Sequence, residues 1–344
     1  MLSLVQSQTQ KSVFKSCIVG MGLLLTSPPS LAEQTDTAPI ILQKIILSEK
    51  VRQKISQRVR SKLQTSSEPS SLSTALPSSL QLGMNNLPVL TQGEHGTCVT
   101  FAVTAAIDAT LSQGQYSSQL CLLQLGHHLE RMNGEPSGWD GTSIDDVLRR
   151  IKNYGIINIT DQQQYGCGGI QTYPEKESTP SSEMTLKNYL QHSTMLPETQ
   201  ITWSTLWSSF DLFSTPTDET VIRTKEAIHK GQRVIVSAVL PRIYTNRTGA
   251  VGTYHQTKDT WVLTPAVGVN FVTIKEHRGH AMIVTGYDDR ACATDQSGEK
   301  HCGLFTLRNS WGPNVGDGGD FYMSYDYFDL FVLDAVQIGI AHRS

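Results

Sequence analysis

One cysteine in this sequence stands where a thiol becomes a nucleophile. Cys98 follows Gly96-Thr97 and opens the run Cys98–Leu111, which is apolar nearly all round. Such a run predicts a buried helix with the cysteine in its first turn. The unpaired N–H groups and partial positive charge of a helix N-terminus stabilise a thiolate and lower the pKa of the thiol. The pattern therefore predicts Cys98 as a nucleophile.

Three other side chains supply the remaining parts of such a site. His280 and Asn309 stand at the ends of two predicted strands that a polar loop connects. An antiparallel hairpin would place them side by side, so that the Asn309 oxygen orients the imidazole as general base and acid. Gln92, six residues before Cys98, can fold back so that its amide and the Cys98 N–H form an oxyanion hole.

The elements that must position these residues change in kind along the chain. Amphipathic patterns closed by glycine predict helices over Ile144–Tyr154 and Glu219–Lys230. Short β-rich runs follow, and they predict strands over Val234–Leu240, His280–Tyr287, Gly303–Arg308 and Asp320–Tyr325. Helices before strands indicate an α+β fold, with a helical lobe followed by a sheet or barrel lobe.

The first residues have the pattern of an export signal. Lys11 and Lys15 precede the apolar run 17–25, and Ser30-Leu31-Ala32 resembles a small-residue cleavage site. We expect residues 1–32 to be a signal peptide. The protein is then exported to a periplasm or secreted, or delivered to a lysosomal or vacuolar lumen in a eukaryotic host.

Residues 33–79 differ from the rest of the chain in charge. An apolar stripe at four-residue spacing predicts a helix, and residues 33–64 hold seven basic and three acidic side chains, a net charge of +4. The remaining residues, 65–344, carry −9. A Ser/Thr-rich stretch at 61–80 predicts a linker open to proteolysis. Residues 33–79 are thus a candidate pro-segment, or a simple tether, before a domain at 80–335.

Composition excludes several classes of protein. The 344 residues are 38% hydrophobic and carry a net charge of −3, which is enough apolar material for a core without the basic excess of a nucleic-acid binder. Apolar runs of the length that spans a bilayer do not occur. We therefore expect no nucleic-acid partner, and no membrane association after signal cleavage.

Cysteine pairing follows from the export prediction. Loss of Cys17 leaves five cysteines, so four would pair in an oxidising compartment and Cys98 would stay free. Cys292 and Cys302 lie in the predicted hairpin loop, where a local disulfide is favoured. Cys121–Cys167 is then the remaining pair, the alternative being two buried thiols.

Three blocks resemble papain-like cysteine peptidases in their order along the chain. They are QGEHGTC (92–98), GHAMIVTGYDD (279–289) and LRNSWG (307–312), the last followed by GDGGDFYMSYDY (316–327). Weaker similarity covers SSQLC (117–121), GTSIDDVLRRIKNYGI (141–156) and GQRVIVSAV (231–239). The resemblance spans about residues 80–330.

The resemblance implies a two-lobe α+β fold whose cleft holds the active site. By it, Cys98 is the nucleophile, His280 the general base and acid, Asn309 the orienting residue and Gln92 the oxyanion donor. Peptide bonds of a protein or peptide substrate would be hydrolysed through an acyl-enzyme, with no metal or organic cofactor. Separately from the resemblance, the charge contrast and the cleavable linker support the hypothesis that the segment 33–79 is an intramolecular inhibitor.

The sequence departs from the family pattern around the nucleophile. His95 stands where the family usually has a cysteine, and Val99 where it has an aromatic residue, so the usual disulfide at the nucleophile loop cannot form. The Cys98-to-His280 spacing of 182 positions exceeds the usual ~130–150. A polar, turn-rich insertion at 161–218 accounts for the excess, and a loop of that length could roof the cleft.

Two alternatives remain at this stage. One is a pseudopeptidase that uses the fold as a binding surface. The presence of a suitable residue at all four catalytic positions argues against this alternative. The other is the same thiol machinery used for acyl transfer or for hydrolysis of a non-peptide amide, which only a substrate screen separates from proteolysis.

The export prediction has a direct test. N-terminal sequencing of the protein from its native host is expected to begin near residue 33, because Ala32 ends the cleavage motif. A protein that keeps Met1 in a membrane-free lysate would contradict export.

Overall fold

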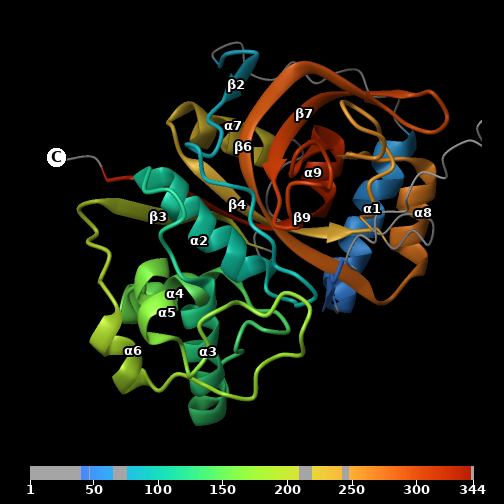
Figure 1. Cartoon of the computed structure of the whole chain (residues 1–344). Helices are drawn as coiled ribbons and strands as arrows, with labels where there is room; N and C mark the ends of the chain where they lie inside the picture. The colour runs from blue at the N-terminus through green and yellow to red at the C-terminus, as the bar shows by residue number, and fades with distance from the viewer. Residues whose placement is uncertain (1–39, 46, 65–75, 209–218, 242–247, 342–344) are drawn as a thin grey trace, which may run out of the picture. The chain divides into compact units, whose positions relative to one another are not determined.

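The predicted α+β fold is confirmed, since the helices of the first half and most strands of the second half lie in different parts of the structure. The computed structural model describes residues 40–45, 47–64, 76–208, 219–241 and 248–341. The predicted signal peptide lies outside the described residues, as do the linker stretch 65–75 and the segment 209–218 of the predicted insertion. Figure 1 shows the green helices on one side and most of the orange and red strands on the other.

The helical lobe forms around one buried helix. That helix, α2 (Cys98–Leu111), has 13 of its 14 residues buried, as its all-round apolar sequence requires. Each of the neighbouring helices begins at a Ser, Thr or Asn side chain that accepts a first-turn N–H bond. Their bounds are α3 (Gln119–Asn133), α4 (Ile144–Tyr154), α5 (Ile159–Tyr165) and α6 (Leu186–His192).

The strands form one sheet in which a single long strand is central. The path through the sheet is β3-β9-β4-β6-β7-β8-β5, and β1 and β2 also pair with β6. All pairings are antiparallel except that of β5 with β8. The bounds are β1 (Gln43–Ile45), β2 (Ser79–Gln81), β3 (Ile201–Trp207), β4 (Arg233–Leu240), β5 (Thr260–Trp261), β6 (His277–Thr294), β7 (Lys300–Arg308), β8 (Asp320–Ser324) and β9 (Val332–Ile340).

Four helices pack on the β lobe: α1 (Glu49–Gln64), α7 (Glu219–His229), α8 (Pro265–Thr273) and α9 (Tyr325–Phe331). A second apolar core lies between them and the sheet, separate from the core around α2. Both predicted disulfides are present: Cys121–Cys167 lies in the helical lobe, and Cys292–Cys302 joins β6 to β7. Among the residues that the structure describes, Cys98 is the cysteine left free.

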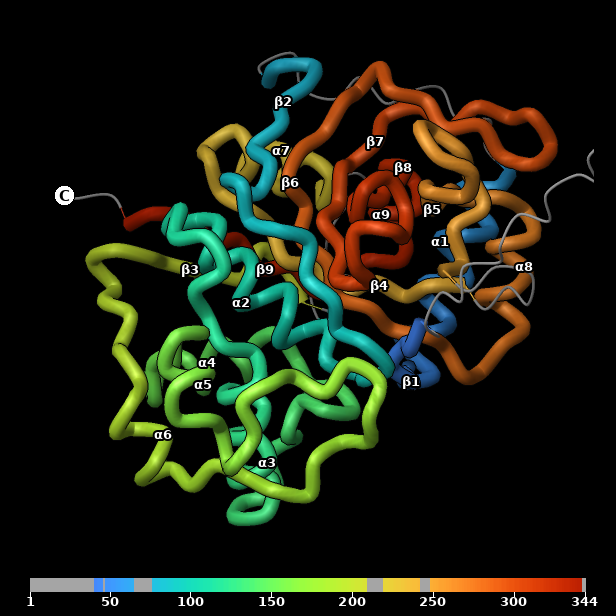
Figure 2. Tube along the Cα trace, in the orientation of Figure 1, coloured from blue at the N-terminus to red at the C-terminus, as the bar shows by residue number. Residues whose placement is uncertain are grey.

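The N-terminal helix α1 belongs to the second core. Ile55 and Val59, from the predicted apolar stripe, are buried there, and Figure 2 shows the blue tube of α1 beside the orange tube of α8. Arg58 and Lys62 form ion pairs with Asp329 and Asp326 of α9, at 2.8 and 2.5 Å. The basic segment and the acidic body are therefore joined by direct ion pairs.

Several elements differ from their sequence expectation. The predicted strand Asp320–Tyr325 ends at Ser324, because the Ser324 side chain caps α9 by accepting from the N–H of Tyr327. The predicted insertion 161–218 is more than a loop, since it contains α6 and the strand β3, which pairs with β9. Packing of the body begins before residue 80, because the Tyr287 hydroxyl donates to Pro77 O at 3.0 Å.

The ion pair between α1 and α9 predicts how firmly the segment is held. Arg58→Ala is expected to destabilise docking of α1 by about 2 kcal/mol, since it removes a charge-assisted bond to the buried Asp329 carboxylate. The rate of proteolytic cleavage within α1 measures docking. Arg60→Ala, at an exposed position of the same helix, is the matched control, and equal cleavage rates in the two variants would refute the expectation.

Candidate active site

The structure places Cys98 at the first residue of α2, beside the strand that carries His280. The Cys98 thiol accepts a bond from the main-chain N–H of Ala281, the residue after His280. Thr97, the residue before the helix, makes no side-chain cap bond. The first-turn N–H groups of α2 therefore have no acceptor in the Thr97 side chain, and those of Cys98 and Val99 bond to the sulfur and lower the pKa of the thiol.

His280 and Asn309 are brought together by their side chains. The His280 Nε2 lies 2.7 Å from the Asn309 Oδ1, and because an amide oxygen only accepts, Nε2 carries the proton. Nδ1 is then the basic nitrogen, and it is buried without a hydrogen-bond partner among the described residues. Trp311 stacks on the imidazole with ring centroids 4.4 Å apart.

This neighbourhood arises differently from the expected hairpin register. His280 pairs across the sheet with Ala238 of β4, whereas Asn309 follows the end of β7. Two register shifts between β6 and β7 displace the simple end-to-end pairing. The strand β6 also begins at His277 rather than His280, because β1 pairs with its first residues.

Burial keeps both predicted reacting groups neutral in this structure. Cys98 is 1% and His280 2% exposed. Desolvation raises the pKa of the Cys98 thiol to about 11, and it lowers the pKa of His280 to about 4 although the bond that His280 donates to Asn309 acts in the opposite direction. The arrangement is therefore a thiol beside a neutral imidazole, whereas the sequence pattern predicts a thiolate.

Gln92 is fully buried, and its amide has a fixed orientation. Its Nε2 donates to His95 O at 2.9 Å, and its Oε1 accepts from the Ser310 hydroxyl at 2.7 Å. An amide nitrogen carries two N–H donors, so one remains beyond the bond to His95. Ser310 follows Asn309, so the bond links Gln92 to the segment that orients His280.

The predicted nucleophile and base line one cavity of about 710 Å³. Its apolar wall comes from α4 and β9, and Thr205 and Ser208 of the predicted insertion also reach it. Five further lining residues belong to the N-terminal segment: Gln43, Ile45, Leu47, Ser48 and Val51. The predicted pro-segment and the predicted site thus share one space.

The strand β1 crosses this space close to His280. Gln43 pairs with Gly279 and Ile45 with His277, which extends the sheet by a strand at the edge of β6. A Cβ atom on Gly279 would collide with the Ile45 side chain, and one on Gly141 with the Gln43 side chain. Both glycines therefore permit the close approach of the segment.

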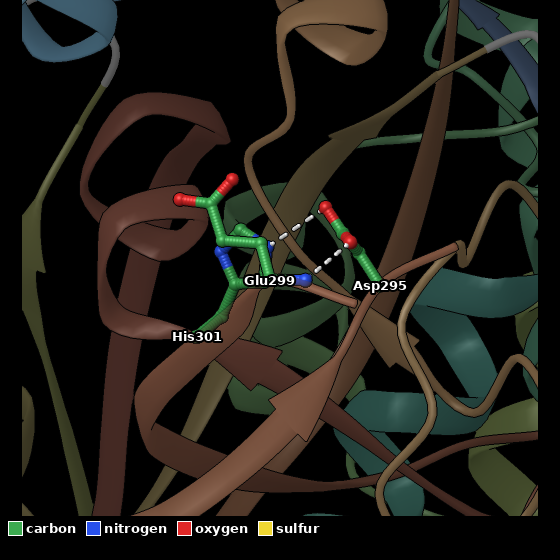
Figure 3. Close-up of side chains that lie close together, drawn as sticks. All are labelled: Asp295, Glu299 and His301. Atoms are coloured by element: carbon green, nitrogen blue, oxygen red, sulfur yellow. Dashed lines mark hydrogen bonds and ion pairs between the residues drawn. The ribbon is translucent and has the colours of Figure 1, made fainter. Parts of the chain in front are cut away.

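A cluster on the β6–β7 hairpin has the composition of a metal site. The ligand atoms of Asp295, Glu299 and His301 lie within 4.8 Å of one another. Figure 3 shows the Asp295 carboxylate bonded to the His301 ring and to the main-chain N–H of Glu299. Ser297 donates two further bonds to the same carboxylate. These hydrogen bonds to Asp295 explain why the three side chains lie close together, as parts of a hydrogen-bonded turn.

Comparison with known proteins gives the following. No protein-family model and no curated protein matches the sequence. Among solved structures, the chain is similar to xylellain, a cysteine protease from Xylella fastidiosa, with 17% identity over 81% of this chain and 91% of that one and a TM-score of 0.49. The structural neighbours of this chain are papain-like cysteine proteases.

Two further neighbours are of the same kind. Procathepsin L 3 of Tenebrio molitor larval midgut is 16% identical over 88% of this chain and 84% of that one, with a TM-score of 0.46. The bromelain protease from Ananas comosus, in complex with the E64 inhibitor, is 16% identical over 78% of this chain and all of that one, with a TM-score of 0.45. In the part of the chain that the structure describes, no helix has both the length and the apolarity to cross a membrane.

Sequence reasoning missed two sets of residues near this site. The strand Gln43–Ile45 is too short for a periodic signal, and Tyr173 lies in a polar, turn-rich stretch. The Tyr173 hydroxyl nevertheless contacts both Gln92 O and the Thr97 side chain. Neither contact has a local sequence signature.

The pKa of Cys98 predicts the reactivity of the intact chain. Because the thiol is protonated below a pKa of about 11, haloacetamide labelling is expected to be slow at pH 7 and to rise about tenfold per pH unit towards that value. Intact-mass measurement counts the label, and Cys98→Ala sets the background. Fast labelling of the intact chain at mildly acidic pH would contradict a buried, neutral thiol.

Proposed function

We propose that this protein is an exported papain-like cysteine peptidase made as a precursor. The observation that carries the proposal is the His280–Asn309 bond of 2.7 Å beneath Trp311. His280 lies on β6, and the next residue of that strand, Ala281, contacts the Cys98 sulfur at the start of the buried helix α2. A nucleophile and a base therefore line one cavity, and an orienting amide is hydrogen-bonded to the base, in the arrangement that acyl transfer to a thiol needs.

In the proposed mechanism, His280 Nδ1 takes the thiol proton and the Cys98 thiolate attacks the peptide carbonyl. The free N–H of the Gln92 amide and the Cys98 N–H stabilise the resulting oxyanion. The imidazolium gives its proton to the departing amine, which breaks the C–N bond and leaves a thioester. Water then attacks the thioester as His280 takes its proton, which releases the acid and restores the thiol.

The proposed export is supported by the redox state of the cysteines. Four of the five cysteines left after signal cleavage form two disulfides, a state that persists in oxidising compartments. The fifth is Cys98, the residue that the mechanism needs reduced.

The segment 33–79 is, in this proposal, an inhibitor rather than a tether. Its β1 residues pair with β6 up to Gly279, next to His280, and they line the cavity that a substrate would enter. The helix α1 anchors it through Arg58 and Lys62. While this segment is bound, a peptide cannot reach Cys98, and the burial that keeps both reacting groups neutral persists.

The test uses the full chain with a protease site placed within residues 65–75 and cut after folding. The uncut chain is expected to label slowly at Cys98 and to hydrolyse few peptides. After cutting and separation of the segment, labelling is expected to persist at mildly acidic pH, to slow in His280→Ala, and to accompany peptide hydrolysis that Cys98→Ala abolishes.

Two outcomes would overturn separate parts of the proposal. Labelling of the cut protein only above pH ~8, unaffected by His280→Ala, would indicate an ordinary thiol and remove the peptidase function. Equal hydrolysis before and after cutting would remove inhibition by the segment while leaving the peptidase in place.

A further inference from the structure

The loop 92–98 lacks the disulfide usual in papain-like peptidases, yet it is held at several points. The support comes from residues 173–175, which lie between α5 and α6. The His95 Nε2 lies 2.6 Å from Pro174 O, and the Glu94 N–H donates to Glu175 O at 2.7 Å. The segment that holds the loop is itself fixed near its start, because Cys167 is bonded to Cys121.

Tyr173 differs from its neighbours because its hydroxyl touches both ends of the loop. It donates to Gln92 O at 2.8 Å, and the Thr97 Oγ1 lies 2.9 Å away. A phenol has one proton, so with that proton on Gln92 O the Thr97 hydroxyl must donate to Tyr173. The bonds then run in one direction, from Thr97 through Tyr173 to Gln92. Burial raises the pKa of Tyr173 far above its ordinary value, so the phenol keeps its proton.

This bond has a consequence for the first turn of α2. Threonine before a helix usually accepts a bond from a first-turn N–H, but the Thr97 side chain makes no such bond. Its hydroxyl is directed to Tyr173 instead. The N–H groups at the start of α2 are thereby left without an acceptor in the Thr97 side chain, and those of Cys98 and Val99 lie at the sulfur.

The Tyr173 ring has a separate, structural role. It stacks on Trp139 with centroids 5.7 Å apart and an interplanar angle of 9°, and it meets Phe101 edge-on at 5.1 Å. His95 packs edge-on against Trp139 at 5.0 Å. These ring contacts depend on area and shape, so removal of the hydroxyl alone leaves them in place.

We propose that Tyr173 is a positioning residue that sets the oxyanion donors of the site through its hydroxyl bonds to Gln92 and Thr97. The inference rests on the proposed function and adds to it a residue from the predicted insertion. The hydroxyl fixes the backbone of Gln92, whose side chain supplies one donor, and it keeps the N-terminus of α2 available for the other.

Tyr173→Phe is the variant that separates position from packing. In the cut protein, kcat for a peptide substrate is expected to fall about tenfold with KM within about twofold, because a displaced oxyanion donor weakens transition-state binding alone. The matched control is Tyr189→Phe, since Tyr189 is a buried tyrosine of α6 whose hydroxyl donates to a single main-chain oxygen, that of Gly155 after α4, at 3.0 Å. That variant is expected to keep kcat.

Two reagents give a readout that does not need a peptide substrate. The Cys98 thiol adds to the carbonyl carbon of a small peptide aldehyde and forms a hemithioacetal. The former carbonyl oxygen of this adduct is stabilised by the oxyanion donors. Haloacetamide alkylation forms a C–S bond without an oxyanion. Tyr173→Phe is therefore expected to weaken aldehyde binding about tenfold while changing the alkylation rate less than twofold. Thr97→Val is expected to behave in the same way, and the double variant no worse than either single one.

The outcomes distinguish this inference from the proposed function. If the wild-type cut protein binds aldehyde and Tyr173→Phe matches it in kcat and aldehyde affinity, the role of Tyr173 is overturned and the peptidase stands. An equal loss in Tyr189→Phe would show a general effect of stability and would also overturn it. A wild-type cut protein that neither hydrolyses peptides nor binds aldehyde overturns both.

Discussion

The packing of α2 against β6 is the contact on which the candidate site depends. Because α2 is buried on all sides, it cannot slide or turn without exposing buried residues. The strand β6 is held in turn by pairing with β1, β2, β4 and β7. The sulfur of Cys98 meets the N–H of Ala281 where these two rigid elements meet. The relative positions of thiol and imidazole therefore follow from burial of the elements that carry them.

The same burial decides the electrostatics of the site. A helix N-terminus stabilises an anion by at most about 2 kcal/mol, equivalent to about 1.5 pKa units. Desolvation opposes it and wins, since it raises the pKa of Cys98 from 9.0 to about 11. The helix dipole that the sequence pattern suggests is present, but in a covered cleft it cannot produce a thiolate. Access of water to the cleft is consequently the variable that controls the charge of the site.

Features with a local cause could be predicted from the sequence. The buried helix after Gly96-Thr97 follows from its composition, and Cys292 and Cys302 are close in any hairpin of that length. Roles that depend on pairing between distant segments could not be predicted. Gln43–Ile45 is a strand only because β6 offers an edge, and Tyr173 lies in a stretch without periodicity although it is in contact with Gln92. The α9 helix was missed because Ser324, which caps it, also ends a strand.

The covalent connection between α1 and the body has a thermodynamic meaning of its own. A binding segment joined to its target within one chain is present at an effective concentration of about millimolar, whatever the concentration of the protein. A weak three-residue pairing such as that of Gln43–Ile45 with β6 can therefore stay occupied while it is intramolecular. Hydrolysis of one bond in the linker changes none of the contacts. It makes the occupancy of the cleft depend on protein concentration, so that dilution can release the segment.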